Sequence, residues 1–153
     1  MVRLAILLLL GAMAALAQFL EFRIRFDDGG CLSCAESLER RLQRVRGVET
    51  VKLDLEQGIV ELKLAADNGV RLAPLMSRIE QGAAKALETR LVAKGMVVDA
   101  GGARRLDLQG EAAGQVYLLE GDMGDRLGQA TIEADLLDAA EGRLRVVSIR
   151  PAQ

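Results

Sequence analysis

Two cysteines, Cys31 and Cys34, have the clearest capacity for chemistry in this chain. Two residues separate them, which lets both sulfur atoms converge on one ion. They follow an alternating stretch and precede a helical pattern, so we expect them where a helix begins. The free amides and the positive end of the helix dipole favour thiolate over thiol at such a place. The pair therefore predicts a dithiolate at a strand-to-helix corner.

Two thiolates alone suit a soft metal ion that accepts few ligands. Cu(I) meets that description and is the first choice, with Hg(II) as the close alternative. Zn(II) usually takes four ligands, and the 153 residues include no histidine and no third cysteine. Zinc would therefore need a carboxylate or a second molecule to complete its shell. The absence of histidine also excludes catalysis by an imidazole base, and we expect no catalytic residues and no organic cofactor site.

The same cysteine pair allows other roles. It could close as a structural disulfide in an oxidising compartment, although a disulfide that closes so small a loop stabilises the fold only slightly. It could also exchange disulfides, because thioredoxin-like proteins place such a pair at a helix N-terminus. That fold needs a cis proline facing the motif, whereas Pro74 lies in a helical pattern and Pro151 near the end of the chain. A third possibility is a protein-binding module in which the cysteine pair is vestigial.

Hydrophobic periodicity predicts the elements that position the cysteines. Apolar residues alternate in three stretches, and the last two stretches form a hairpin with a turn at Gln57-Gly58. Apolar spacings of three and four predict two amphipathic helices, with Pro74 in the first turn of the second. The predicted strands span 22–26, 51–56 and 60–64, and the predicted helices span 35–45 and 72–79. The order is strand, helix, strand, strand, helix.

The chain after residue 86 has a different pattern. A strand-like region runs from Leu87 to Val98, long enough to finish one sheet and begin another. Four short apolar stretches follow, separated by turns rich in glycine and acidic residues, and no helix is predicted. These stretches are 106–109, 115–119, 130–136 and 143–149. This half loosely resembles a small five-stranded oligonucleotide/oligosaccharide-binding (OB) barrel.

Residues from about 20 to 86 resemble a heavy-metal-associated domain, the βαββαβ ferredoxin-like module of copper chaperones, copper-pump N-termini and periplasmic mercury-binding proteins. In that family a Gly-Met-x-Cys-x-x-Cys loop joins the first strand to the first helix, and the matching stretch here is Asp28-Gly29-Gly30-Cys31-Leu32-Ser33-Cys34. The resemblance implies the metal-ligand role for Cys31 and Cys34. Gly29 stands where the family usually has a packing methionine. The stretch 79–82 is similar to the family's Ile-x-x-Ala-Gly turn, without the aromatic residue that commonly follows.

We therefore predict an α+β chain in two parts. A ferredoxin-like domain over 20–86 precedes a small antiparallel β-barrel of OB-like form over 87–153. Such barrels bind oligomers through basic grooves and stacked aromatic residues. Here the second part has 8 basic against 11 acidic residues, and Tyr117 is its sole aromatic residue. With a net charge of −2 for the whole chain, nucleic acid is not an expected partner.

Residues 1–17 have the pattern of a secretory signal peptide. Arg3 precedes an apolar run, and small residues end at Ala17, so cleavage would leave Gln18 first. The alternative is a retained membrane anchor, because 4–20 carries no charge and approaches the roughly 20 residues that a spanning helix needs. We expect an exported protein, periplasmic or extracellular, which contacts the membrane only if this segment is retained.

The function expected from the site and the resemblance is capture and delivery of a soft metal. An incoming ligand would displace one cysteine at a time, and the partners would be proteins that donate or accept the ion. Four arginines crowd the outer face of the first helix, namely Arg40, Arg41, Arg44 and Arg46. They form either an ordinary solvated face or a docking surface for an acidic partner next to the metal loop.

Overall fold

The computed structural model describes residues 18–66, 68–82, 84–108 and 115–152. The predicted signal segment, 1–17, lies outside these residues. The elements are β1 (Gln18–Asp27), α1 (Leu32–Gln43), β2 (Val48–Asp54), β3 (Ile59–Leu64), α2 (Leu72–Glu80), β4 (Lys85–Ala100), β5 (Ala103–Asp107), β6 (Val116–Glu120), β7 (Gly128–Asp138) and β8 (Arg143–Pro151). Neither helix in the described ranges is long and apolar enough to cross a membrane.

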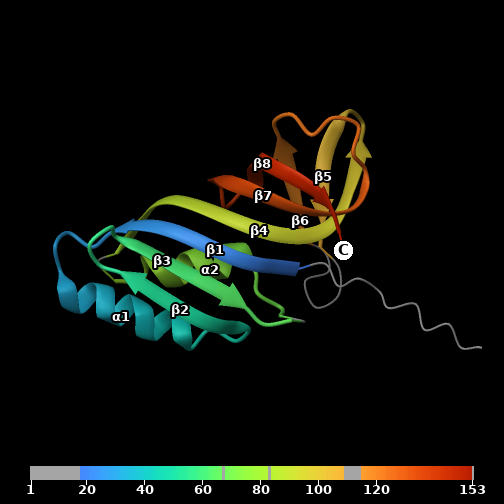
Figure 1. The fold of residues 1–153 in the computed structure, drawn as a ribbon. Helices are drawn as coiled ribbons and strands as arrows, with labels where there is room; N and C mark the ends of the chain where they lie inside the picture. The colour runs from blue at the N-terminus through green and yellow to red at the C-terminus, as the bar shows by residue number, and fades with distance from the viewer. Residues whose placement is uncertain (1–17, 67, 83, 109–114, 153) are drawn as a thin grey trace, which may run out of the picture.

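The first part of the molecule is a four-stranded antiparallel sheet covered on one face by two helices. The strand order is β2-β3-β1-β4, and α1 and α2 lie on the same face (Figure 1). In β1, Phe22, Ile24 and Phe26 are buried, whereas Arg23 and Arg25 are exposed. This alternation buries one face of the strand, as expected of a half-buried sheet. The predicted ferredoxin-like fold is confirmed.

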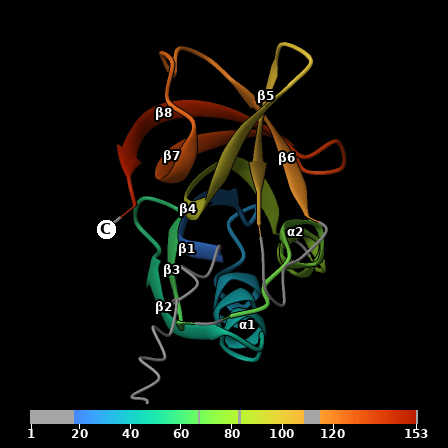
Figure 2. The same cartoon turned by 90° about the vertical axis from the view of Figure 1, so that its right-hand side faces the viewer.

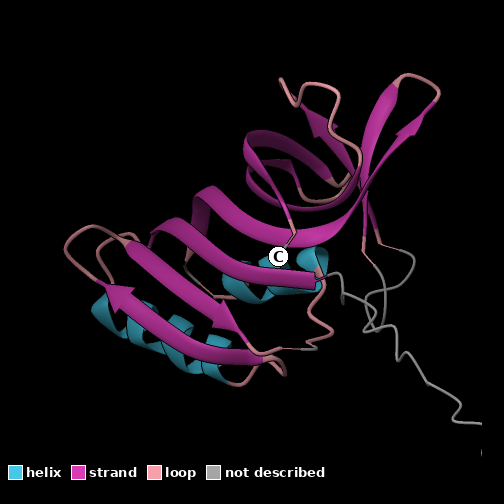
Figure 3. Ribbon diagram, turned by 45° about the vertical axis from the view of Figure 1, so that its right-hand side comes forward, coloured by secondary structure: helices cyan, strands magenta, loops and turns pink. Residues whose placement is uncertain are grey.

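The strand β4 belongs to both parts of the molecule. Its residues 85–94 pair with β1, its residues 96–100 pair with β5, and 90–97 pair with β7. Figure 3 shows this strand passing from the sheet into the second part without a break. The boundary predicted after residue 86 therefore falls inside β4, and no linker stands there.

The second part is a closed barrel of five strands. The order β4-β5-β6-β8-β7 returns to its start because β7 also pairs with β4 (Figure 2). The closed five-stranded barrel agrees with the predicted architecture, and its OB-like character stays a prediction. One feature of the prediction is wrong: β6 pairs with β8 in parallel. Two reversals of chain direction, before and after β7, separate these strands, so they run the same way.

The two parts share one hydrophobic core. Buried side chains from the helices, the sheet and the barrel form a single cluster. At the junction the ring of Phe19 in β1 lies 5.4 Å from the ring of Tyr117 in β6. The hydroxyl of Tyr117 accepts a hydrogen bond from the Leu72 amide at the start of α2 and bonds to the side chain of Gln115. The barrel is therefore packed against the helical layer as well as continuous with the sheet.

A buried asparagine organises the end of the sheet where β1 begins. The amide nitrogen of Asn68 donates hydrogen bonds to the carbonyls of Phe19 and Ala65, both at 2.8 Å. Its side-chain oxygen accepts from the Val70 amide at 3.2 Å. Asn68 thus ties the start of β1 to the loop that leads into α2.

Candidate metal centre

Both cysteines lie at the N-terminus of α1. Cys31 is the N-cap residue, with an extended backbone, and Cys34 lies in the first turn. The Cys34 amide donates to the Sγ of Cys31 at 3.2 Å. Both cysteines are half-buried, while Leu32 and Ser33 between them are exposed. The sequence pattern therefore positioned the pair correctly at the strand-to-helix corner, with one side open to solvent.

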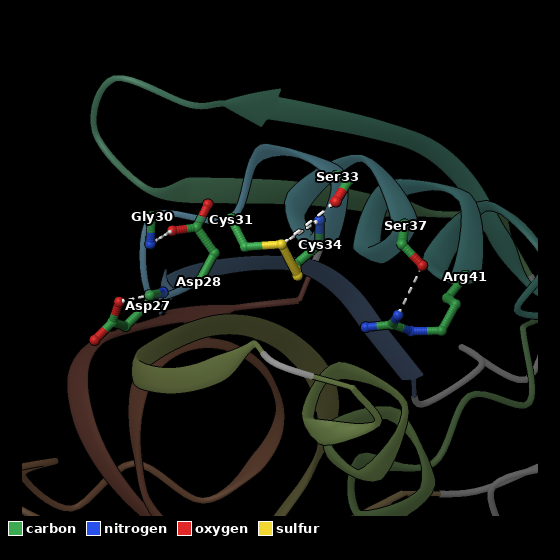
Figure 4. The surroundings of a disulfide bond; sticks show 9 residues. Asp27, Asp28, Gly30, Cys31, Ser33, Cys34, Ser37 and Arg41 are labelled. Atoms are coloured by element: carbon green, nitrogen blue, oxygen red, sulfur yellow. Dashed lines mark hydrogen bonds between the residues drawn. A yellow bond between two sulfur atoms is a disulfide. The ribbon is translucent and has the colours of Figure 1, made fainter.

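The two sulfur atoms form a disulfide, with the Cα atoms 5.2 Å apart (Figure 4). A disulfide sulfur carries no thiolate charge, so a metal ion needs the reduced form of the pair. In the disulfide form the Cys34 amide donates to the Cys31 Sγ, and the Ser33 hydroxyl lies 3.4 Å from the same sulfur.

The loop before the cysteines is held by its own aspartates. Asp27 accepts from the Gly29 amide and Asp28 accepts from the Gly30 amide, each at 2.8 Å. The backbone has φ of +64° at Gly29 and +79° at Gly30, which glycine adopts at no steric cost. These Asx turns shape the loop at the position where the resembling family has a packing methionine. Sequence reasoning missed this role, although an aspartate two residues before a glycine is a recognisable signal for such a turn.

The donor set fits a soft ion with two ligands. Within the described residues, no group of three or more histidine, cysteine, aspartate or glutamate side chains lies close enough together to hold a metal ion. A tetrahedral zinc site therefore cannot be completed by these residues. Once reduced, the pair would offer two thiolates, a donor set that suits a soft ion with few ligands.

The arginines of α1 do not gather beside the cysteines. Arg41 is half-buried, and its guanidinium donates to the Ser37 hydroxyl at 3.0 Å and to the Arg78 carbonyl at 3.3 Å; Figure 4 shows the first of these bonds. Arg44 is the C-cap residue, at the opposite end of α1 from Cys31. A helix of 12 residues spans about 18 Å. Of the two interpretations of these arginines, an ordinary solvated face or a docking surface next to the metal loop, the second does not apply to Arg44, which lies at the far end of α1.

Comparison with known families identifies the first part of the molecule. The model of the heavy-metal-associated domain family matches residues 24–85. The chain contains a heavy-metal-associated domain. The match begins within β1 and ends at the first residue of β4, so it includes the loop, both helices and both cysteines. The resemblance inferred from the sequence is confirmed.

The heavy-metal-associated domain connects the cysteine pair to a class of ligand. Domains of this family bind heavy-metal ions, and Cys31 and Cys34 stand at the position of the family's Cys-x-x-Cys motif. No curated protein matches the chain. Heavy-metal binding is therefore the functional class of this domain.

Proposed function

We propose that this protein is a soft-metal carrier that binds one Cu(I) ion through the reduced thiolates of Cys31 and Cys34. The observation that carries the proposal is the cysteine pair at the N-terminus of α1 within a heavy-metal-associated domain. Hg(II) is the close alternative, because it shares the preference for two sulfur ligands. Zn(II) would need ligands from a second molecule. The proposed role is transport of the ion, with no catalytic step.

Metal uptake starts with reduction of the disulfide. Two electrons and two protons, supplied by a dithiol reductant, convert the bridge into two thiols, and binding of the ion then releases the thiol protons. The exposed residues Leu32 and Ser33 leave one side of the pair open. A thiolate of the partner can therefore add to the bound ion before one cysteine leaves, so that the ion is never without sulfur ligands.

We propose that the protein acts outside the cytoplasm, in the periplasm or the extracellular space. The sequence of residues 1–17 supports this location. Disulfides persist in such compartments, so the bridge between Cys31 and Cys34 would be the resting state. The partners would then be a reductant and a protein that donates or accepts the metal ion.

Titration of the reduced protein with Cu(I), in competition with a chromophoric chelator, tests the proposal. We expect one ion per chain and no binding by the oxidised protein. Cys31→Ser and Cys34→Ser should each weaken binding by about a hundredfold or more, because one thiolate remains where the ion needs two. Ser33→Ala is the matched control, since it changes the same loop and keeps both sulfurs. Binding by the reduced protein no tighter than by a double-serine variant would contradict the proposal.

The disulfide itself favours a second function, thiol-disulfide exchange. A bridge at a helix N-terminus has a stabilised leaving thiolate, which speeds exchange. An exchange protein would turn over a disulfide substrate in the presence of a reductant, and a metal carrier would not. A protein-binding module with a structural disulfide would show neither turnover nor metal uptake.

A further inference from the structure

A groove lined by four arginines lies between the ends of the two helices. Arg44 and Arg46 follow α1, Arg71 is the N-cap residue of α2, and Arg78 lies in its last turn. The groove has a volume of about 400 Å³. Its other lining residues are mainly apolar: Val45, Gly69, Val70, Pro74 and Leu75. We call this feature the arginine groove.

The four arginines have no carboxylate partners among the described residues. Five other described arginines form ion pairs: Arg23 with Glu61, Arg25 with Glu88, Arg90 with Asp135 and Glu133, Arg104 with Asp99, and Arg143 with Glu120 and Glu141. Further arginines outside the groove, such as Arg105 and Arg150, have no ion pair among the described residues, so the groove differs from them in that four such charges line one hollow. No described acidic residue lines the arginine groove. Four uncompensated positive charges therefore gather in a protein whose net charge is −2. Such a concentration of one sign of charge attracts a ligand of the opposite sign.

The guanidinium groups, rather than the end of the helix, supply the hydrogen-bond donors. The Leu72 amide at the start of α2 is bonded to the Tyr117 hydroxyl, and Pro74 has no amide hydrogen. A guanidinium presents a planar fork of donors that matches the two oxygens of a carboxylate. The apolar floor adds contacts for aliphatic groups between the charges.

We propose that the arginine groove binds an acidic segment of a partner protein. Carboxylates of the segment would pair with the four arginines, and an aliphatic side chain would lie over Val45 and Pro74. A membrane surface fits less well, because surfaces that bind lipid insert large apolar side chains. The exposed large apolar side chains of the described residues all lie outside this groove.

A partner held in the arginine groove leaves the cysteines free. Arg44 caps the end of α1 opposite to Cys31, about 18 Å along the helix axis. Binding in the groove is therefore independent of the redox state of the cysteine pair and does not rest on the proposed metal function. The groove would bind the partner at a surface that does not include the sulfur atoms of the cysteine pair.

The test measures fluorescence anisotropy of a labelled peptide with the whole purified protein at low ionic strength. The probe consists of three Glu-Glu-Leu repeats, and the control probe has glutamine in place of every glutamate. We expect the acidic probe to bind at least about tenfold more tightly than the control probe, with an affinity that falls as salt is added. The affinity should be the same before and after reduction of the disulfide.

Two pairs of substitutions locate the binding site. Arg44→Gln with Arg71→Gln should weaken binding of the acidic probe by about tenfold or more, because two charged contacts are lost. Arg105→Gln with Arg150→Gln removes the same charge from exposed barrel positions and should leave the affinity unchanged. Circular dichroism checks that both variants are folded.

Several results would overturn the proposal. Equal affinities of the two double variants would mean that the groove is not the binding site. Failure of the acidic probe to bind the unmodified protein would exclude an acidic peptide as the ligand. Binding to anionic phospholipid vesicles through Arg44 and Arg71, without binding of the probe, would reassign the groove to a membrane surface.

Discussion

Cys31 serves both the helix and the sulfur site. Its Sγ accepts the Cys34 amide as an N-cap and is also one half of the disulfide. Serine is a favourable N-cap residue, because its hydroxyl oxygen accepts the same kind of hydrogen bond. Cys31→Ser therefore preserves the start of α1, and a loss of metal binding in that variant would report on the thiolate rather than on the helix.

Asn68 is the single polar residue on which we expect the sheet to depend most. Asn68→Ala should lower the free energy of unfolding by about 2–4 kcal/mol, because it leaves the buried Phe19 carbonyl and Val70 amide without their partner. Urea denaturation followed by circular dichroism measures the change.

Two variants separate the hydrogen bonds of Asn68 from its shape. Asn68→Asp keeps the acceptor for Val70 but places oxygen against the carbonyls of Phe19 and Ala65, so we expect a loss at least as large. Ala66→Ser changes an exposed neighbour and should shift stability by less than about 0.5 kcal/mol. If Asn68→Ala were as mild as this control, the three hydrogen bonds would not stabilise the fold as we infer.

At the scale of elements, β4 determines how the sheet becomes a barrel. Along one edge it exchanges β1 for β5 at Gly95, which is buried. A Cβ at Gly95 would lie 2.8 Å from the Asp107 carbonyl and 2.9 Å from a methyl group of Leu106. Only glycine lets β5 approach β4 this closely at the point of exchange.

Gly95→Ala should destabilise the protein by about 2–3 kcal/mol, because either β5 or the backbone of β4 must move to relieve the overlap. Thermal or urea unfolding checks the prediction. Gly101→Ala is the control, because a Cβ at that position would have no atom within 4 Å. Its backbone φ of +68° is unfavourable for alanine, so we expect this variant to lower the free energy of unfolding by about 1 kcal/mol. An effect at Gly95 no larger than at Gly101 would count against close packing of β5 on β4.

At the scale of the whole molecule, Tyr117 links the barrel to α2 and to β1. Its ring contacts Phe19 and its hydroxyl accepts from the Leu72 amide. Burial is the main cause that raises the pKa of Tyr117 to about 12, and the Leu72 hydrogen bond opposes the rise. The folded protein therefore holds the phenol proton more strongly than the unfolded chain does.

This raised pKa predicts a loss of stability in alkali. Below about pH 10, the tyrosine pKa of an unfolded chain, both states keep the proton and the stabilisation is complete. Between about pH 10 and 12 the unfolded chain loses the proton first, so stability falls as the pH rises. From pH 9 to 11.5 we expect the unmodified protein to lose roughly 2 kcal/mol more than Tyr117→Phe, as measured by urea denaturation. Parallel losses in both proteins would contradict the role of the buried phenol.

Local patterns in the sequence determined the elements and the candidate site. The period of two in β1 and the spacings of three and four in α1 and α2 reflect which side of each element is buried. The separation of Cys31 and Cys34, with their place between strand and helix, was also a local property. These features were predictable because each depends on residues within a few positions of one another.

How distant segments meet depends on the folded chain as a whole. The length of β4 was visible in the sequence as one long strand-like region, but its partners were not. Strand pairing depends on segments far apart in the chain, so the pairing of β7 with β4 and the parallel pairing of β6 with β8 left no local signal. The roles of the arginines also left no local signal. Arg41 forms hydrogen bonds between the two helices. Arg44 and Arg46, from the end of α1, line the same groove as Arg71 and Arg78 of α2. The sequence determined the pieces through local periodicity, and packing of the chain determined which pieces became neighbours.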